Sequence, residues 1–432
     1  MYKLLLPLTL VASIFLPAAA QTLDLPRTGD MAQASPYRPA KAPEPSGPLT
    51  LQSALALALS ANAEVSAARY ELAAVEASVV QAGASPNPSL GVQMQDTRRD
   101  TRETTVQLSQ PFELGGKRAA RIQAAERGRD AAGAELGAKQ AEVRAAVISS
   151  FFDLMTAQER VRLAQESADL AQRASTVASK RVIAGKVSPV EETRARVAET
   201  GVRLELLQAR SDLTSARKRL SAMWGSLTPR FERAEGEIQS LPALPDPAAL
   251  SAGLVSSPAL ARARFEVDRR QALARLERSR RTPDVTVSLG VNRNEELGRN
   301  QAIVGVSVPL PIFDTNRGNV LEALRRTDKA RDELAGIEIR LGSELALAIE
   351  KLSTSRQEVQ SLQQDILPGA QSAYEAATTG FEYGKFGFLD VLDAQRTLLQ
   401  AKTQYLRALS EAHRAGAEID RILGEPMAAT SH

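Results

Sequence analysis

The chain has no cysteine and only two histidines, His413 and His432, among its 432 residues. Without cysteine it can form no disulfide and carry no lipid-modified N-terminal cysteine. Tight zinc or cobalt sites usually need histidine or cysteine ligands, so no such site is expected. His413 is predicted to lie on a helix surface, and no nucleophile, phosphate-binding loop or metal motif is recognisable. We therefore expect neither an enzyme nor a protein with a cofactor.

A large excess of one charge is also lacking. The chain has 54 Lys and Arg residues against 51 Asp and Glu residues, a formal net charge of +3. Basic residues gather at Arg278 with Arg280-Arg281 and at Arg325-Arg326, but acidic residues are interleaved with them. A nucleic-acid interface needs a clustered excess of positive charge, so we interpret these clusters as solvated helix faces and expect no nucleic-acid partner.

The N-terminal apolar run, from Leu4 to Leu16, is too short for a membrane-spanning helix, which needs about 20 residues. Lys3 precedes it and Ala18-Ala19-Ala20 follow it, a pattern typical of a signal peptide over residues 1–20. A retained anchor is the alternative, and it fits the length less well. Residues 21–48 contain six prolines and predict an extended segment with little secondary structure.

The remaining chain contains an internal duplication. Residues 181–206 resemble residues 380–405, with Gly185-Lys186 aligned on Gly384-Lys385, 199 residues further on. A duplication with a period of about 200 residues indicates a duplicated fold rather than a solenoid. The predicted organisation is listed here in chain order: first repeat 49–224 with a hairpin at 89–111, connection 225–256, second repeat 257–424 with a hairpin at 284–311, and C-terminal tail 425–432.

Each repeat is predicted to run helix, hairpin, long helix, turn, helix. The first helix is expected from Leu49, capped by Thr50, to about Ala84, before two prolines. The long helix from Gly116 to about Ile183 has no proline and would measure about 100 Å. Its counterpart in the second repeat is expected to be interrupted only at Pro368.

The predicted strands alternate between apolar and small polar residues. In the second hairpin Val285, Val287, Leu289 and Val291 share one face. This pattern fits a half-buried soluble sheet, and it equally fits an outer-membrane barrel with lipid outside and water inside. A membrane sheet cannot leave open edges in lipid, and four strands are too few to close. If the hairpins lie in a membrane, two chains would give eight strands and three would give twelve.

The duplicated pattern, together with the segments GKFGFLDVLDAQRTLLQAK (384–402) and PLPIFDTNRGN (309–319), resembles the TolC-like outer membrane efflux proteins over about residues 49–423. The segment QPFELGGKR (110–118) is most similar to the subfamily of cation efflux systems, the CzcC-like proteins for cobalt, zinc, cadmium or nickel. One residue departs from the family pattern. TolC-like drug channels often carry an arginine where Phe386 stands, so the resemblance does not extend to a closing salt bridge there.

The resemblance implies a mainly α fold with a small β part, assembled as a homotrimer. A twelve-stranded outer-membrane barrel, four strands per protomer, would continue into a periplasmic tunnel of helices. It implies two protein partners, a periplasmic adaptor and an inner-membrane, proton-driven pump of the RND type, and the outer membrane of a Gram-negative bacterium as the location. The chain would be a passive duct for divalent heavy-metal cations.

The resemblance also assigns site residues. Asp390 and Asp393, three residues apart at a helix start, would narrow the periplasmic aperture as a ring of carboxylates. Capping of that helix is an equally good reading of Asp390. The adaptor would contact the two helix-turn-helix tips, whose residues are Gly185, Lys186, Ser188, Pro189, Gly384, Lys385, Phe386 and Gly387.

Two other functions remain open from the sequence. The channel could carry drugs or other organic solutes. Alternatively, the protein could be a structural periplasmic coiled coil, a scaffold or adaptor whose hairpins are soluble. An outer-membrane trimer and a peripheral scaffold would differ in whether salt washes the protein from the membrane.

Overall fold

The computed structural model describes residues 44–246, 250, 253–383 and 385–424. The predictions for residues 1–20, for most of 21–48, for 425–432, for His432 and for Gly384 lie outside these residues. The described elements are β1 (Leu49–Thr50), α1 (Leu51–Ala61), α2 (Ala63–Ala82), β2 (Ser89–Gln95), β3 (Glu103–Phe112), α3 (Lys117–Ile183), α4 (Pro189–Ala222), β4 (Ala234–Glu235), α6 (Pro258–Ser279), β5 (Val285–Asn294), β6 (Arg299–Ser307), α7 (Arg317–Ser361), the π-helical turn η2 (Leu362–Ile366), α8 (Leu367–Glu382) and α9 (Phe388–Leu423). The predicted class, mainly α with a small β part, is confirmed.

The two hairpins form one antiparallel sheet with strand order β2-β3-β5-β6. The central pair is β3 with β5, and Leu108 lies between Leu90 on β2 and Leu289 on β5. Matching alternation places apolar residues opposite one another across all four strands in two rows, the row of Leu108 and the row of Val106. Each hairpin therefore supplies half of a single four-stranded sheet.

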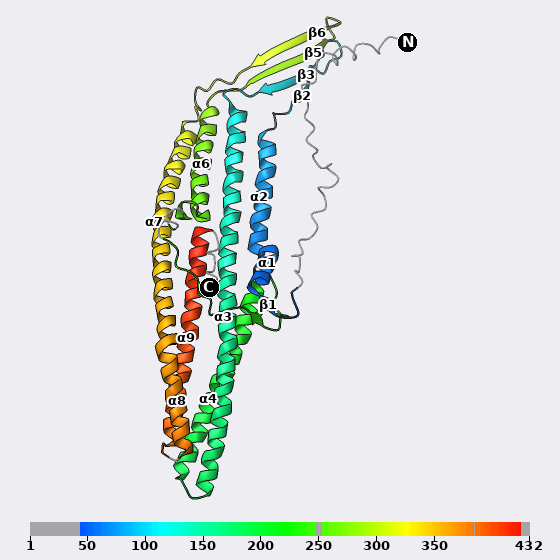
Figure 1. The fold of residues 1–432 in the computed structure, drawn as a ribbon. Helices are drawn as coiled ribbons and strands as arrows, with labels where there is room; N and C mark the ends of the chain where they lie inside the picture. The colour runs from blue at the N-terminus through cyan, green and yellow to red at the C-terminus, as the bar shows by residue number, and fades with distance from the viewer. Residues whose placement is uncertain (1–43, 247–249, 251–252, 384, 425–432) are drawn as a thin grey trace. The chain divides into compact units, whose positions relative to one another are not determined.

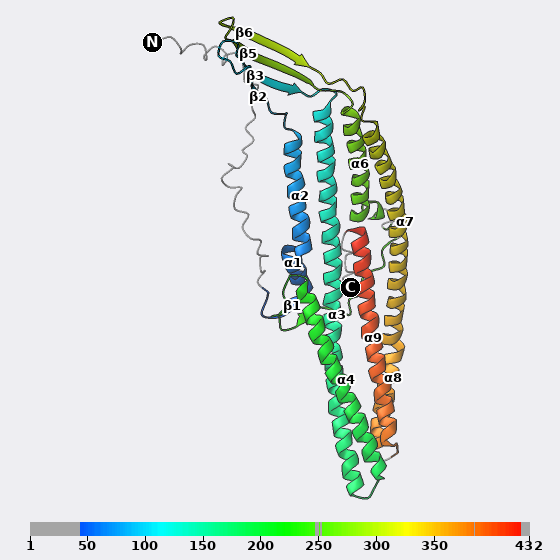
Figure 2. The ribbon, with the colours of Figure 1, turned by 180° about the vertical axis from the view of Figure 1, so that it is seen from behind.

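The helices run alongside one another in two repeats of the same design (Figure 1). The 67-residue α3 packs against α2 over its first part and α4 over its second. In the same way, α6 and then α9 pack along α7 and α8, as the reverse view also shows (Figure 2). In each repeat, two shorter helices thus share the length of one long helix. Contacts of α3 with α6 and α9 join the repeats.

The first predicted helix, Leu49 to Ala84, is wrong in detail because it is broken at Asn62. The Asn62 Oδ1 accepts hydrogen bonds from the amides of Glu64 and Val65, which caps α2, and its Nδ2 donates to the Met223 carbonyl at 2.9 Å. An Asn side chain is a strong helix N-cap, so it starts a new helix inside an apparently continuous pattern. Thr50 caps α1, as expected, by accepting from the Ser53 amide.

The predicted interruption at Pro368 takes the form of a π-helical turn. In η2 the Leu367 amide donates to the Leu362 carbonyl, five residues back. Proline has no N–H to donate and its ring crowds the carbonyl four residues earlier, so an α-helix cannot pass through unchanged. The wider turn accommodates Pro368 one residue into α8, and the helix then continues.

His413 corrects another expectation, because it lies in the protein interior and not on a helix surface. Only 4% of it is exposed. Its ring stacks on Phe152, with the centroids 3.5 Å apart, and Nε2 is 2.8 Å from the Ile238 carbonyl oxygen. Burial lowers the pKa of His413 below its ordinary value, so the ring is neutral at pH 7 and Nε2–H donates to Ile238.

The segment between the repeats crosses the helices and is held on both sides. Gln158 on α3 accepts a hydrogen bond from the Ala234 amide at 2.8 Å and donates one to its carbonyl. Beyond Ile238, the Pro242 carbonyl accepts from Arg356 on α7. We call residues 233–242 the inter-repeat strap.

The basic clusters lie among acidic partners, as predicted. Arg280 pairs with Glu277, and Arg325 pairs with Asp328. These are helix-surface pairs of the kind that contribute little to stability.

None of the helices in the described ranges has a stretch long and apolar enough to span a membrane.

Candidate functional site

One face of the four-stranded sheet consists of large apolar side chains that no described part of the chain covers. Leu90 on β2 is 70% exposed, and Val304 on β6 is 74% exposed. The other members of this face are Val92, Met94, Val106, Leu108, Leu289, Val291 and Val306. A contiguous exposed apolar surface is rare on soluble monomers and marks a surface that contacts another protein or lipid.

The opposite face carries small and polar residues. Across three strands, Ser109 lies between Ser89 and Ser288, and Gln107 lies between Gly91 and Gly290. At the turn end of the sheet, Glu103 accepts hydrogen bonds from the side-chain amides of Asn292 and Asn294. A sheet with one apolar and one polar face and no helix over the apolar face has the arrangement of a barrel wall in lipid.

The sheet is incomplete by itself, because β2 and β6 each pair on one side only within the described chain. Their outer edges expose unpaired N–H and C=O groups. Such edges recruit further strands, and in lipid they are not tolerated at all.

The segment QPFELGGKR (110–118) connects the sheet to the helices through two ion pairs. Glu113, directly after β3, pairs with Arg121 on α3, and Arg121 Nε also donates to the Ala82 carbonyl at the end of α2. The hydrogen bond from Arg121 lowers the pKa of Glu113. On the other side, Lys117 Nζ lies 2.7 Å from Asp284 Oδ1, just before β5.

Gly115 in the same segment could not be replaced easily. Its φ is +69°, and a Cβ there would lie 2.6 Å from Cβ of Thr282. This motif therefore fixes the angle at which the sheet leaves the helices.

The first tip joins α3 to α4 in five residues. Gly185 has a φ of +68°, the left-handed conformation that glycine adopts without strain. The Lys186 amide donates to the Arg181 carbonyl at 2.9 Å, and the Ser188 hydroxyl accepts from the Val190 amide to cap α4. Pro189 follows as the first residue of α4, where its missing N–H costs nothing.

The second tip repeats this turn at the positions that the duplication predicts. The Lys385 amide donates to the Gly380 carbonyl at 2.8 Å, the counterpart of the Lys186–Arg181 bond. Gly387 occupies the place of the capping serine and has no side chain. The helix is capped instead by Asp390, whose Oδ2 accepts from the Gly387 amide at 2.8 Å.

The tips expose large apolar side chains. Ile183 and Val190 at the first tip are 83% and 54% exposed, and Tyr383 and Phe386 at the second are 77% and 49% exposed.

One contact links the end of α3 to α8 near the tips. The Arg181 guanidinium lies over the Phe381 ring, 4.2 Å from its centroid. This contact was not predicted from the sequence, since it depends on how the two repeats pack.

Asp390 and Asp393 are both exposed near the start of α9, but their surroundings differ. Asp390 is a helix cap, so that reading of the residue is confirmed. Asp393 lines a cavity of about 470 Å³ between α4 and α9, beside Arg194 and Arg396. Within the described residues no group of three or more His, Asp or Glu side chains could hold a metal ion.

These features define a class of protein in which a sheet with an exposed apolar face continues into a long helical body. Residues 54–226 and 249–425 match the family described as outer membrane efflux protein. The chain belongs to this family.

Two relatives and one solved structure show how far the similarity extends. The chain is 49% identical to the cobalt-zinc-cadmium resistance protein CzcC of Cupriavidus metallidurans, over 88% of this chain and 91% of that protein. It is 32% identical to the nickel and cobalt resistance protein CnrC of the same organism, over 72% of this chain and 74% of that protein. The crystal structure of the CmeC outer membrane channel of Campylobacter jejuni superimposes with a TM-score of 0.74 at 16% identity, covering 88% of this chain and 87% of that one.

The protein is thus an outer-membrane efflux protein with a long periplasmic helical part. The match to the family runs through both repeats. The four-stranded sheet is the element that suits the membrane, and the helices form the remainder.

Proposed function

We propose that this protein is the outer-membrane channel of a tripartite efflux system that exports divalent heavy-metal cations such as Co²⁺, Zn²⁺, Cd²⁺ or Ni²⁺. The observation that supports this cargo is the 49% identity to CzcC along nearly the full length of both chains. The chain has no cysteine and its described part has no candidate metal cluster, which suits a duct whose partners select the ion.

The channel is proposed to be a homotrimer. Four strands per chain and two open sheet edges call for strands from other chains, and three chains give a closed barrel of twelve. In this arrangement β6 of one protomer pairs with β2 of the next. The apolar face, with Leu90 and Val304, faces lipid, and the face with Ser109 and Gln107 faces water.

Assembly can be tested by disulfide crosslinking, without background because the chain has no native cysteine. A cysteine at Gln93 in β2 is combined with cysteines placed one at a time along β6. Oxidation should give covalent trimers for a short run of β6 positions that alternate with period two. Pairing of the same cysteines within one chain, or no crosslink at any β6 position, would contradict the shared barrel.

The tips are proposed to bind the periplasmic adaptor. Support comes from their exposed apolar side chains and from two turns with matching hydrogen bonds, so that a trimer would present six similar turns. The adaptor in turn would connect the channel to an inner-membrane, proton-driven pump.

Asp390 and Asp393 are proposed to form a ring of six carboxylates at the periplasmic mouth of the trimer. Both are exposed at the tip end of α9. Charged rings of this kind attract cations in channels, and the effect weakens as salt screens it.

The cargo is tested by deleting the gene and measuring growth on zinc, cobalt, cadmium and nickel and on an antibiotic panel. Sensitivity to one or more of the metals alone, reversed by the wild-type gene, is expected. Sensitivity to antibiotics with unchanged metal tolerance would assign the channel to organic solutes instead.

A further inference from the structure

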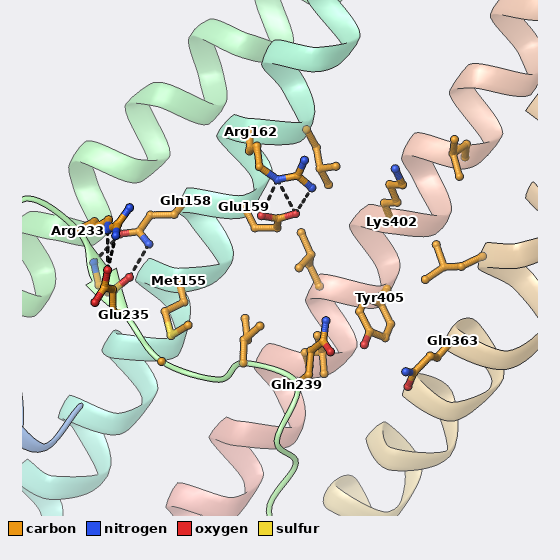
Figure 3. A pocket seen from close by; sticks show the side chains of 18 of the residues that line it. Met155, Gln158, Glu159, Arg162, Arg233, Glu235, Gln239, Gln363, Lys402 and Tyr405 are labelled. Atoms are coloured by element: carbon orange, nitrogen blue, oxygen red, sulfur yellow. Dashed lines mark hydrogen bonds and ion pairs between the residues drawn. The ribbon is translucent and has the colours of Figure 1, made fainter. Parts of the chain in front are cut away.

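A large cavity lies between α3 and α9, beneath the inter-repeat strap (Figure 3). Its volume is about 890 Å³, within the range of small-molecule sites. Residues of α3 such as Met155 and Gln158 form one wall, and Tyr405 and Leu409 of α9 form the opposite wall. The cavity opens to solvent beside Arg162, whose side chain is 54% exposed, so a ligand can enter it. Its size and its position under a well-anchored strap suggest a binding site.

The walls are mainly apolar along the length of the cavity. Leucines come from three elements: Leu163 on α3, Leu367 on α8, and Leu398, Leu406 and Leu409 on α9. Between residues 398 and 409 the helix rises about 16 Å, so the cavity suits an elongated ligand. The π-helical turn contributes Gln363 to the same wall, and such turns often occur at functional sites.

Two of the three basic residues that line the cavity are paired with carboxylates. Arg162 is paired with Glu159 and also with Glu166, and Arg233 is paired with Glu235. Lys402 is the remaining basic residue of the lining, and no carboxylate lies within ion-pair distance of it in the described part of the chain.

Lys402 lies toward the tip end of the large cavity. A second cavity of about 250 Å³, on the side toward the tips, shares Lys402 and Leu398 with the large one. Tyr405 lies one helical turn beyond Lys402 and faces the same cavity, across from Glu159 and Arg162 (Figure 3). Burial raises the pKa of Tyr405, so its hydroxyl keeps its proton and can donate a hydrogen bond.

We propose that this cavity binds a single-chain amphiphile with an anionic headgroup, a long-chain alkyl carboxylate or alkyl phosphate. The headgroup pairs with Lys402 and accepts a hydrogen bond from Tyr405. The alkyl tail lies along Leu406 and Leu409 toward Met155, beneath the strap. The site is separate from the proposed aperture and tips, so its occupancy can be measured independently of metal export.

The test uses the full-length protein in an amphipathic polymer free of detergent and three probes with the same tail: dodecanoate, dodecyl phosphate and dodecyltrimethylammonium. Isothermal titration should show saturable binding of dodecanoate, dodecyl phosphate or both, at one per chain. The cationic probe should bind far more weakly. The stronger of the two anions identifies the headgroup, a free carboxylate or a phosphate ester.

Variants locate the site. Lys402→Gln should weaken anion binding about tenfold, equivalent to about 1.4 kcal/mol, and Lys402→Arg should retain it. Lys351→Gln is the matched control, because Lys351 is an exposed α7 lysine that lines neither cavity. Gln239→Trp, at an exposed lining position of the strap, should reduce binding of both anions by filling the opening.

The proposal is overturned if no probe binds saturably, if the cationic probe binds as well as the anions, or if Lys402→Gln behaves like Lys351→Gln. Trimer mobility and helix content, measured for each variant, exclude misfolding as the cause of a loss. Gln239→Trp changes only an exposed residue, so it tests the cavity even if Lys402 variants assemble poorly.

Discussion

The ring of Phe386 lies directly against Gly380, where a Cβ would fall 2.1 Å from Cδ2 of the ring. The Gly380 carbonyl also accepts the Lys385 amide that closes the second tip. Gly380 therefore provides both the space for the Phe386 ring and the carbonyl that accepts the hydrogen bond closing the turn. Phe386 stands at the position where related drug channels often carry an arginine. Packing, and not an ion pair, fixes the turn here.

Replacing Gly380 by alanine should displace Phe386 and disturb the second tip. We expect reduced metal tolerance in cells, with trimer yield unchanged, even though alanine favours the helix by roughly 0.5–1 kcal/mol. Gly369→Ala is the matched control, since it lies in the same helix and a Cβ there meets nothing within 4 Å. Equal metal tolerance of cells carrying Gly380→Ala and cells carrying Gly369→Ala would show that packing of Phe386 against Gly380 is not needed.

Gly185→Val should disturb the first tip through the backbone. A β-branched residue at φ +68° is strained, by about 1–2 kcal/mol, and the turn has to change. We expect loss of metal tolerance and of adaptor crosslinking from a cysteine at Lys186. The sheet lies about 100 Å away by helix rise, so the trimer should persist.

Gly201→Val is the control for Gly185→Val, because Gly201 lies within α4 with open space around its Cβ. It introduces the same side chain without the left-handed backbone. Undiminished adaptor crosslinking from the Lys186 cysteine in the Gly185→Val variant would show that the first tip is not part of the adaptor interface.

The capping role of Asp390 can be tested separately from the proposed effect of the Asp390 and Asp393 charges on ion selectivity. Asp390→Ala removes the cap on the Gly387 amide and should cost about 0.5–1 kcal/mol, whereas Asp390→Asn keeps an acceptor. Planar-bilayer conductance of the trimer should show loss of cation preference in the Asp390→Asn, Asp393→Asn double variant at low salt. Selectivity equal to wild type would leave Asp390 as a cap and Asp393 without a role at the mouth.

His413 predicts a pH dependence of stability. Its folded pKa is lowered by burial below the ordinary value of 6.5, so the unfolded chain binds this proton more readily. The stability that depends on the neutral ring is complete above about pH 6.5 and declines as the pH falls below it. Arg414 and Asp153, the sequence neighbours of His413 and Phe152, form an ion pair with each other.

The comparison is wild type against His413→Gln, which can still donate to the Ile238 carbonyl but does not titrate. Between pH 7.5 and 5, the apparent Tm of wild type should fall about 1–3 °C further than that of the variant. Parallel curves would mean that His413 does not contribute to the pH dependence.

Much of this fold follows from periodicity. The strand alternation and the proline-free stretch before Ile183 predict the sheet and the longest helix closely. The duplication also predicts that the two tips share a turn, and the Lys186–Arg181 and Lys385–Gly380 hydrogen bonds do occupy aligned positions. Local pattern is sufficient where a structure depends on neighbours along the chain.

Other features depend on contacts between distant residues and could not be predicted in this way. The pattern around His413 is that of a half-exposed helix, but stacking on Phe152 of α3 and the strap crossing at Ile238 bury it. The cavity beneath the strap has the same origin, since residues 233–242 carry no periodic signal. Asn62 is different, because a capping residue within a helical run is a local signal that the sequence itself contains.

The central claim is that this channel exports divalent metal cations, and direct measurement of export tests it. Cells that lack the gene and cells complemented with it are loaded with radioactive zinc, cobalt, cadmium or nickel and then transferred to metal-free medium. We predict that the complemented cells release at least one of these ions several-fold faster, and that the Gly185→Val channel does not restore release. Equal release with and without the channel for all four ions would contradict the account.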